Sequence, residues 1–182
     1  MPKKDANRSR YGNIILALIC FVLQLALAPN LTLGAGRFNF ALIYAFCIAF
    51  LIGGRRAVIH GFMAGLIFDL ATTGPFGLMT LLLCVMSYLL GLEGRNRFAD
   101  GLGAALSSFA VSSFAVILIY HLTMLALGDA SSLADVLIWR VLPSFALSFV
   151  AFCIFAWYFA RDAAAGVSAR PKRGSHYSMK GL

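Results

Sequence analysis

The chain has 182 residues, of which 61% are hydrophobic and 12% are charged, and its formal net charge is +8. Soluble domains carry roughly 25% charged and about 45–50% apolar residues, and a domain this small leaves much of its surface in water. The composition therefore excludes an ordinary soluble domain and favours a protein whose solvent is lipid. The basic residues lie near the ends and between the apolar runs, which is typical of membrane orientation and argues against a nucleic-acid partner.

Six apolar runs follow one another along the chain, and a spanning helix needs about 20 such residues. Turn-forming or charged segments end most of them, such as Pro29 and Asn30 after the first run and Gly74 and Pro75 after the third. We predict an all-α fold, a six-helix transmembrane bundle over residues 14–160, with spans at about 14–28, 38–52, 57–71, 78–92, 102–127 and 136–160. The second and third runs are short for a full crossing, and we expect Pro143 to kink the sixth.

The lysines and arginines are divided unequally between the two sides that six spans create. Of the 15, all but Arg37 and Arg140 fall on the side that holds both termini. The positive-inside rule then predicts a basic cytoplasmic N-terminus (1–13) and a basic, disordered cytoplasmic tail (161–182) close to anionic lipids. The first run also resembles a cleaved signal peptide, but Pro29 disfavours cleavage after Ala28, so we expect this helix to be retained.

Polar residues inside the predicted spans form no catalytic pattern. There is no HExxH or GxSxG motif, and the four cysteines show neither CxxC pairing nor metal-ligand spacing. We therefore expect no catalytic residues, no metal and no cofactor. The polar residues concerned are Gln24, His60, Asp69, His121 and Arg140.

Asp69 is the most informative of these residues, because a carboxylate at the centre of a bilayer costs about 2.5–3.5 kcal/mol. Its place near the outer end of the third span lowers that cost. An intramembrane pair of Asp69 with Arg140 is one possibility, and a local pair of Asp135 with Arg140 is another. We favour a structural anchoring role for Asp69 over proton relay.

Small residues recur every four positions in four of the predicted helices, as they do where helices pack closely in membranes. We expect these stripes to serve packing inside the bundle, with docking of a partner helix as the alternative. The stripes comprise Ala41, Ala45, Ala49 and Gly53; Ala57, Gly61, Gly65 and Asp69; Ala104, Ser108 and Ser112; and Ser144 and Ser148.

Residues 61–91 carry the one pattern that resembles a known family. A glycine-rich helix ends in Asp69 and Leu70, the turn Gly74-Pro75-Phe76-Gly77 opens the next helix, and Tyr88 and Gly91 follow an apolar run. This pattern resembles the central signature of the MreD family of rod-shape-determining membrane proteins, although Phe76 stands where the family has a Leu-like residue. Elsewhere the likeness is one of topology. The positions that match as structural residues are Gly61, Gly65, Asp69, Leu70, Pro75, Gly77 and Gly91.

The resemblance implies a non-enzymatic scaffold of the cell-elongation machinery in the bacterial inner membrane. Its implied partner is the single-span protein MreC, and through it MreB, a RodA-type glycosyltransferase and a class B penicillin-binding protein of peptidoglycan synthesis. The family's fold is similar to the substrate-binding subunits of energy-coupling-factor transporters. Such a vitamin-binding subunit is the alternative function, although its Ala-xxx-Ala stripe is expected on the first helix and lies here on the second. A membrane enzyme, the third possibility, lacks a candidate set of residues.

Overall fold

The computed structural model describes residues 3–30, 32–33, 35–92, 101–128 and 132–168, and almost all of them lie in helices. The all-α fold is confirmed, and the helical stretches lie over the six predicted runs. The elements are α1 (Lys3–Ala26), β1 (Thr32–Leu33), β2 (Gly36–Arg37), α2 (Phe40–Leu51), α3 (Gly54–Ala71), α4 (Leu78–Leu92), α5 (Leu102–Ala126), α6 (Leu133–Asp135), the π-helix η1 (Val136–Val141) and α7 (Leu142–Ser168).

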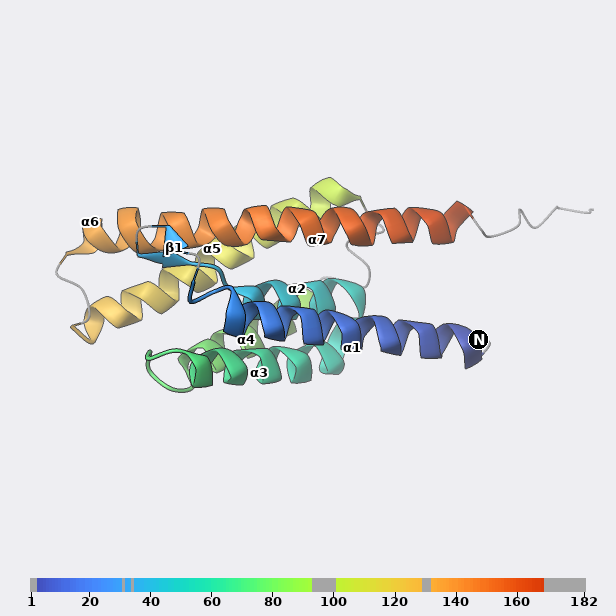
Figure 1. The fold of residues 1–182 in the computed structure, drawn as a ribbon, viewed down its shortest axis with the longest axis horizontal. Helices are drawn as coiled ribbons and strands as arrows, with labels where there is room; N and C mark the ends of the chain where they lie inside the picture. Colours follow the sequence, from blue (N-terminus) through green and yellow to red (C-terminus); the bar gives the residue numbers. More distant parts are fainter. Residues whose placement is uncertain (1–2, 31, 34, 93–100, 129–131, 169–182) are drawn as a thin grey trace, which may run out of the picture.

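The helices lie along one long axis and form an elongated bundle (Figure 1). α5 and α7 lie along one side, and α1, α3 and α4 lie along the other. The start of α1 and the end of α7 are at the same end of the bundle, with the turn between α2 and α3. The two-stranded antiparallel ribbon of β1 and β2, in which Thr32 pairs with Arg37, lies at the opposite end with the turn between α3 and α4.

α2 is the central helix of the bundle. It contacts α1, α3, α4, α5 and α7, and every residue from Phe40 to Phe50 is buried. A helix that is apolar on all sides is stable only when neighbours cover all of it. Its 12 residues give a length of roughly 18 Å, well short of the roughly 30 Å of hydrocarbon in a bilayer. The second predicted run is thus a short, enclosed core helix.

Two helical stretches in the described part of the chain are long and apolar enough to cross a membrane: Leu102–Ala126, and Leu133–Tyr158 within the continuous helix of α6, η1 and α7. Shorter apolar helical stretches are Gly12–Ala26, Phe40–Leu51 and Leu78–Leu92. Pro143 lies just after η1. Proline cannot donate the helical hydrogen bond and clashes with the preceding turn, and a wider π-turn beside it is a common accommodation.

Several helix ends differ from the predicted boundaries, and the largest difference is at α1, which begins at Lys3 although the predicted first span starts at residue 14. α7 continues to Ser168, so the prediction of disorder is wrong for residues 161–168, and residues 169–182 lie outside the described part. α3 begins at Gly54, three residues before its predicted start, which lengthens the third helix.

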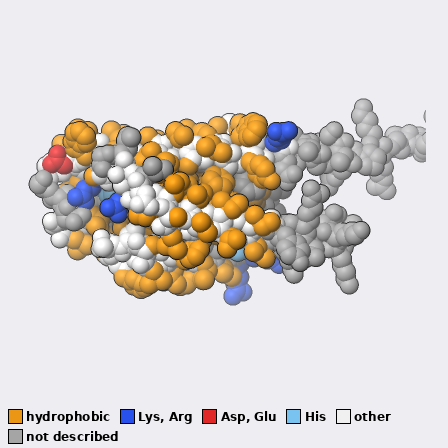
Figure 2. Space-filling view, viewed as in Figure 1, with side chains coloured by type: hydrophobic (Ala, Val, Ile, Leu, Met, Phe, Trp, Pro, Cys, Tyr) orange, Lys and Arg blue, Asp and Glu red, His pale blue; other side chains and the backbone are white. Residues whose placement is uncertain are grey.

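Hydrophobic side chains cover the middle of the bundle in the view of Figure 2, and the coloured charged side chains lie near its two ends. Among the large apolar side chains that are at least 60% exposed are Ile14, Leu18, Leu70, Leu81, Val111, Val150, Ile154 and Tyr158. These residues belong to α1, α3, α4, α5 and α7, so the apolar surface extends over most of the bundle.

Candidate functional site

The glycines of the predicted motif lie inside the hairpin that α3 forms with α4. A Cβ atom on Gly65 would lie 2.8 Å from the backbone nitrogen of Thr80 and 2.9 Å from the carbonyl oxygen of Met79. A Cβ atom on Gly61 would lie 2.8 Å from the carbonyl oxygen of Leu83. Only glycine permits this approach of two backbones. Gly61 and Gly65 therefore serve packing within the bundle, and they leave no free face for a partner.

Gly91 closes the other end of the hairpin. A Cβ atom at this position would lie 2.9 Å from the backbone nitrogen of Gly54. Gly53 and Gly54 both have positive φ, +62° and +61°, in the turn between α2 and α3, a conformation that glycine adopts at no steric cost. Gly91 thus lets the last turn of α4 approach the backbone of that turn.

Asp69 caps the N-terminus of α4 from the facing helix. Its Oδ2 accepts hydrogen bonds from the backbone N–H of Gly77 (3.0 Å) and of Thr80 (3.0 Å) and from the hydroxyl of Thr80 (2.6 Å). Its Oδ1 accepts from the backbone N–H of Met79 at 3.2 Å. The first N–H groups of a helix have no partner within it, and a carboxylate there also interacts favourably with the helix dipole. The buried carboxylate therefore fixes the turn between α3 and α4.

The possible ion pair of Asp69 with Arg140 does not form in the structure. Asp69 directs both carboxylate oxygens to the first turn of α4, and no ion pair joins it to Arg140 among the described residues. Structural anchoring is the role that these contacts support.

The remaining motif and stripe residues have different surroundings. Ala41, Ala45 and Ala49 are buried in the central helix. The carbonyl of Pro75 accepts a hydrogen bond from the N–H of Leu78 at 3.3 Å, and Gly77 has a φ of +92°, so both shape the turn that leads into α4. Leu70 is 69% exposed and does not pack inside the bundle.

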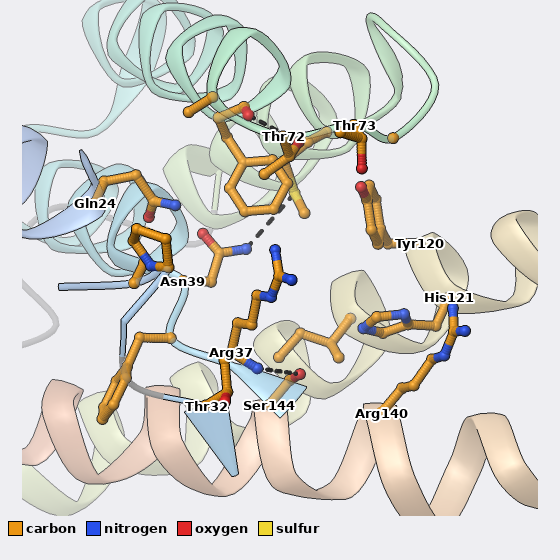
Figure 3. Close-up of a pocket in the computed structure, with 18 of the residues that line it drawn as sticks. Gln24, Thr32, Arg37, Asn39, Thr72, Thr73, Tyr120, His121, Arg140 and Ser144 are labelled. Carbon is orange, nitrogen blue, oxygen red and sulfur yellow. Dashed lines mark hydrogen bonds between the residues drawn. The ribbon is translucent and has the colours of Figure 1, made fainter. Parts of the chain in front are cut away.

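A cavity of about 440 Å³ lies beside this turn, at the end of the bundle that carries β1 and β2 (Figure 3). The cavity is lined by residues of α1, the β-ribbon, α3, α4, α5, η1 and α7. Its apolar wall includes Ala28, Phe68, Met79, Ile117 and Met124. Its polar lining includes Gln24, Thr32, Arg37, Asn39, Thr72, Thr73, Tyr120, His121, Arg140 and Ser144.

The β-ribbon is held against α7 at the edge of this cavity. A Cβ atom on Gly36 would lie 2.6 Å from Cβ of Pro143 and 2.7 Å from the backbone nitrogen of Ser144. The backbone N–H of Arg37 donates to the hydroxyl of Ser144 at 3.2 Å, and that of Asn39 donates to Ser148 at 3.2 Å. The two serines of the stripe predicted in the sixth span thus bind the segment that leads into α2.

Two amides organise the N-terminus of α2 next to the cavity. Oε1 of Gln24 accepts from the backbone N–H groups of Phe40 (2.9 Å) and Ala41 (3.2 Å). Oδ1 of Asn39 accepts from the N–H of Leu42 at 2.9 Å, the usual bond of an N-cap residue. Both polar side chains are buried, and their oxygens satisfy N–H groups that the helix leaves unpaired.

His60 also has a structural partner. Its Nδ1 and the hydroxyl of Tyr44 share a hydrogen bond of 2.8 Å between α3 and α2. Among the described residues, no group of three or more His, Cys, Asp or Glu side chains is placed to hold a metal ion.

Comparison of the chain with models of known protein families, with curated proteins and with solved structures finds no match. The function is therefore argued from the hairpin and the cavity.

Proposed function

We propose that the chain is a non-enzymatic scaffold of the bacterial cell-elongation machinery, of the MreD type, embedded in the inner membrane with both termini in the cytoplasm. The observation that carries the proposal is the capping of α4 by Asp69. The residues that resemble the MreD signature have contacts that explain them: Gly61, Gly65 and Gly91 permit close backbone approach, and Asp69 anchors the turn. A motif whose buried residues all serve helix packing is what a scaffold requires.

The surface of the bundle supports a membrane location. In the most apolar 18-residue windows of the two long helices, 33% and 28% of the residues are buried. A core helix of a soluble protein would be mostly buried, whereas a helix in lipid leaves its apolar side chains exposed to the acyl chains. The start of α3, which carries Arg55 and Arg56, lies at the same end of the bundle as the start of α1 (Figure 1), which supports a common cytoplasmic side.

The partner under this proposal is MreC, bound through its single membrane-spanning helix. Gly61 and Gly65 are enclosed by α4. The helix of MreC would therefore meet another part of the bundle surface. Through MreC the scaffold would connect to MreB and to the RodA-type glycosyltransferase and class B penicillin-binding protein.

The proposal implies that a rod-shaped bacterium encodes the chain, and depletion of the chain in its own organism tests this. We expect depleted cells to round up, and we expect wild-type protein to restore rods. Asp69→Ala should fail to restore them, because the α3–α4 turn loses its anchor, whereas Ser107→Ala, which removes an exposed hydrogen bond on α5, should restore them. Rods that persist after complete depletion would contradict the proposal.

One observation favours a second candidate, the substrate-binding subunit of an energy-coupling-factor transporter. The cavity lies beside β1 and β2, at the end of the bundle opposite the start of α1 and the end of α7, which is the extracytoplasmic end in the proposed orientation. Co-purification with a transporter ATPase module instead of MreC would support this alternative.

A further inference from the structure

We propose that the cavity binds a small amphipathic anion, a carboxylate or phosphate joined to a compact apolar body. The site is separate from the hairpin contacts that carry the scaffold proposal, so the two proposals can fail independently.

The charge of the cavity lining points to an anion. Arg37 and Arg140 both line it, and no Asp or Glu of the described residues does. The Arg37 side chain extends from β2 into the cavity toward Asn39 (Figure 3), and no acidic group of the described residues lies within ion-pair distance of it. Guanidinium groups match the geometry of carboxylate and phosphate oxygens and bind them in bidentate fashion.

The position of Arg37 is fixed by its backbone. The backbone N–H of Arg37 is bonded to Ser144, and Gly36 lies against Pro143 and Ser144 with no room for a side chain. A binding arginine whose backbone is already held loses less conformational entropy when a ligand arrives. The ribbon therefore presents a preorganised cation at the cavity edge.

The N-terminus of α2 adds to the positive field. Phe38 and Asn39, which precede the first turn of α2, line the cavity. The N-terminal end of a helix carries roughly half a positive charge. α4, whose first turn also approaches the cavity through Met79, already has its charge partner in Asp69. The N–H groups at the start of α2 are bonded to the neutral amide oxygens of Gln24 and Asn39, which carry no full negative charge, so the positive end of the α2 dipole lies on the same side of the cavity as Arg37.

The opposite wall supplies the apolar part of the site. Phe68 and Tyr120 meet edge to face with ring centroids 5.7 Å apart, and Met79 and Met124 line the same space. Aromatic and methionine side chains with a few convergent polar groups are typical of small-molecule sites of about 300–1,000 Å³. The volume of about 440 Å³ suits a ligand of one or two rings or short acyl chains.

Binding is tested on the purified full chain in neutral detergent by isothermal titration calorimetry. The soluble probes are 1-naphthyl phosphate and 1-naphthoate, with neutral 1-naphthol as their control. The lipid probe is dihexanoyl phosphatidic acid, with dihexanoylglycerol as its neutral control. We expect at least one anionic probe to bind tenfold or more tightly than its neutral control. Binding of the phosphatidic acid alone would identify a lipid headgroup as the ligand source, and binding of the naphthyl anions would identify a soluble one.

Arg37→Gln should weaken the binding of the anionic probe at least tenfold and leave the binding of the neutral control unchanged. Arg55→Gln removes an exposed arginine at the other end of the bundle and should change neither. Ala71→Phe, which narrows the cavity beside Phe68 and Thr72, should reduce binding without removing charge. Equal binding of anionic and neutral probes, or equal affinity in Arg37→Gln and Arg55→Gln, would overturn the proposal.

Discussion

Asp69 and Thr80 are joined by two hydrogen bonds across the α3–α4 hairpin. Oδ2 of Asp69 accepts from the backbone N–H of Thr80 at 3.0 Å and from its hydroxyl at 2.6 Å. Thr80 is also the residue against which Gly65 packs. Thr80 of α4 is therefore hydrogen-bonded to Asp69 in the last turn of α3 and packed against Gly65 on the same helix. The capping of α4 and the close packing of the two helices thus depend on each other.

Asp69→Ala is expected to destabilise the bundle by about 3 kcal/mol, because hydrogen bonds to a charged group are lost and buried N–H groups stay unpaired. Asp69→Asn should cost less, since one amide oxygen at the place of Oδ2 keeps the bonds from Gly77 and Thr80. Thermal unfolding in detergent measures both variants. Similar midpoints for Asp69→Ala and wild type would contradict the anchoring role.

Gly65→Ala is expected to lower the unfolding midpoint, and Gly65→Leu to prevent hairpin formation, because even a Cβ meets the backbone of α4. Overpacking of this kind costs about 1–3 kcal/mol. The matched control is Gly12→Ala in α1, where nothing lies within 4 Å of the added Cβ and alanine favours the helix. If Gly65→Ala and Gly12→Ala unfolded at the same temperature, the packing role of Gly65 would be wrong.

Gly36→Val is expected to release the β-ribbon from α7, because the larger side chain cannot fit against Pro143 and Ser144. Amide hydrogen exchange should then accelerate over residues 32–39. Ala35→Val changes the exposed neighbouring residue of the same ribbon and should leave exchange unchanged. Unaltered exchange in Gly36→Val would show that the ribbon does not depend on this contact.

Single cysteines test the proposed topology. In a variant with its native cysteines replaced, Thr73→Cys in the α3–α4 turn should react with a membrane-impermeant maleimide on intact spheroplasts. Arg56→Cys at the start of α3 should react only after permeabilisation, because the two positions lie at opposite ends of one helix. Equal labelling of both positions before permeabilisation would exclude α3 as a full crossing.

The sequence allowed the helical segments to be predicted because most of the apolar runs end at a strong turn signal, such as Gly53 and Gly54 or Gly74 and Pro75. It did not reveal that α2 is enclosed on every side. Phe40–Leu51 is as apolar as a lipid-facing helix, and composition does not distinguish a protein neighbour from an acyl chain.

The hairpin contacts were partly visible in the sequence, through the four-residue spacing that places Gly61, Gly65 and Asp69 on one face. The cap on α4 was not, because it depends on where the turn places Gly77 and Thr80. The cavity was also missed, since its lining comes from segments more than a hundred residues apart. The sequence feature that could have indicated the cavity was Arg37, the one arginine outside the predicted spans on the side opposite the predicted cytoplasmic side.

The most direct test of the scaffold proposal is co-purification of the intact chain with MreC of the same bacterium, co-expressed and extracted in mild detergent. The proposal predicts a stable complex in size-exclusion chromatography that retains MreC when the wild-type chain is captured by an affinity tag. It also predicts loss of MreC from Asp69→Ala but not from Ser107→Ala. A monodisperse, thermally stable wild-type chain that leaves MreC entirely in the unbound fraction would contradict it.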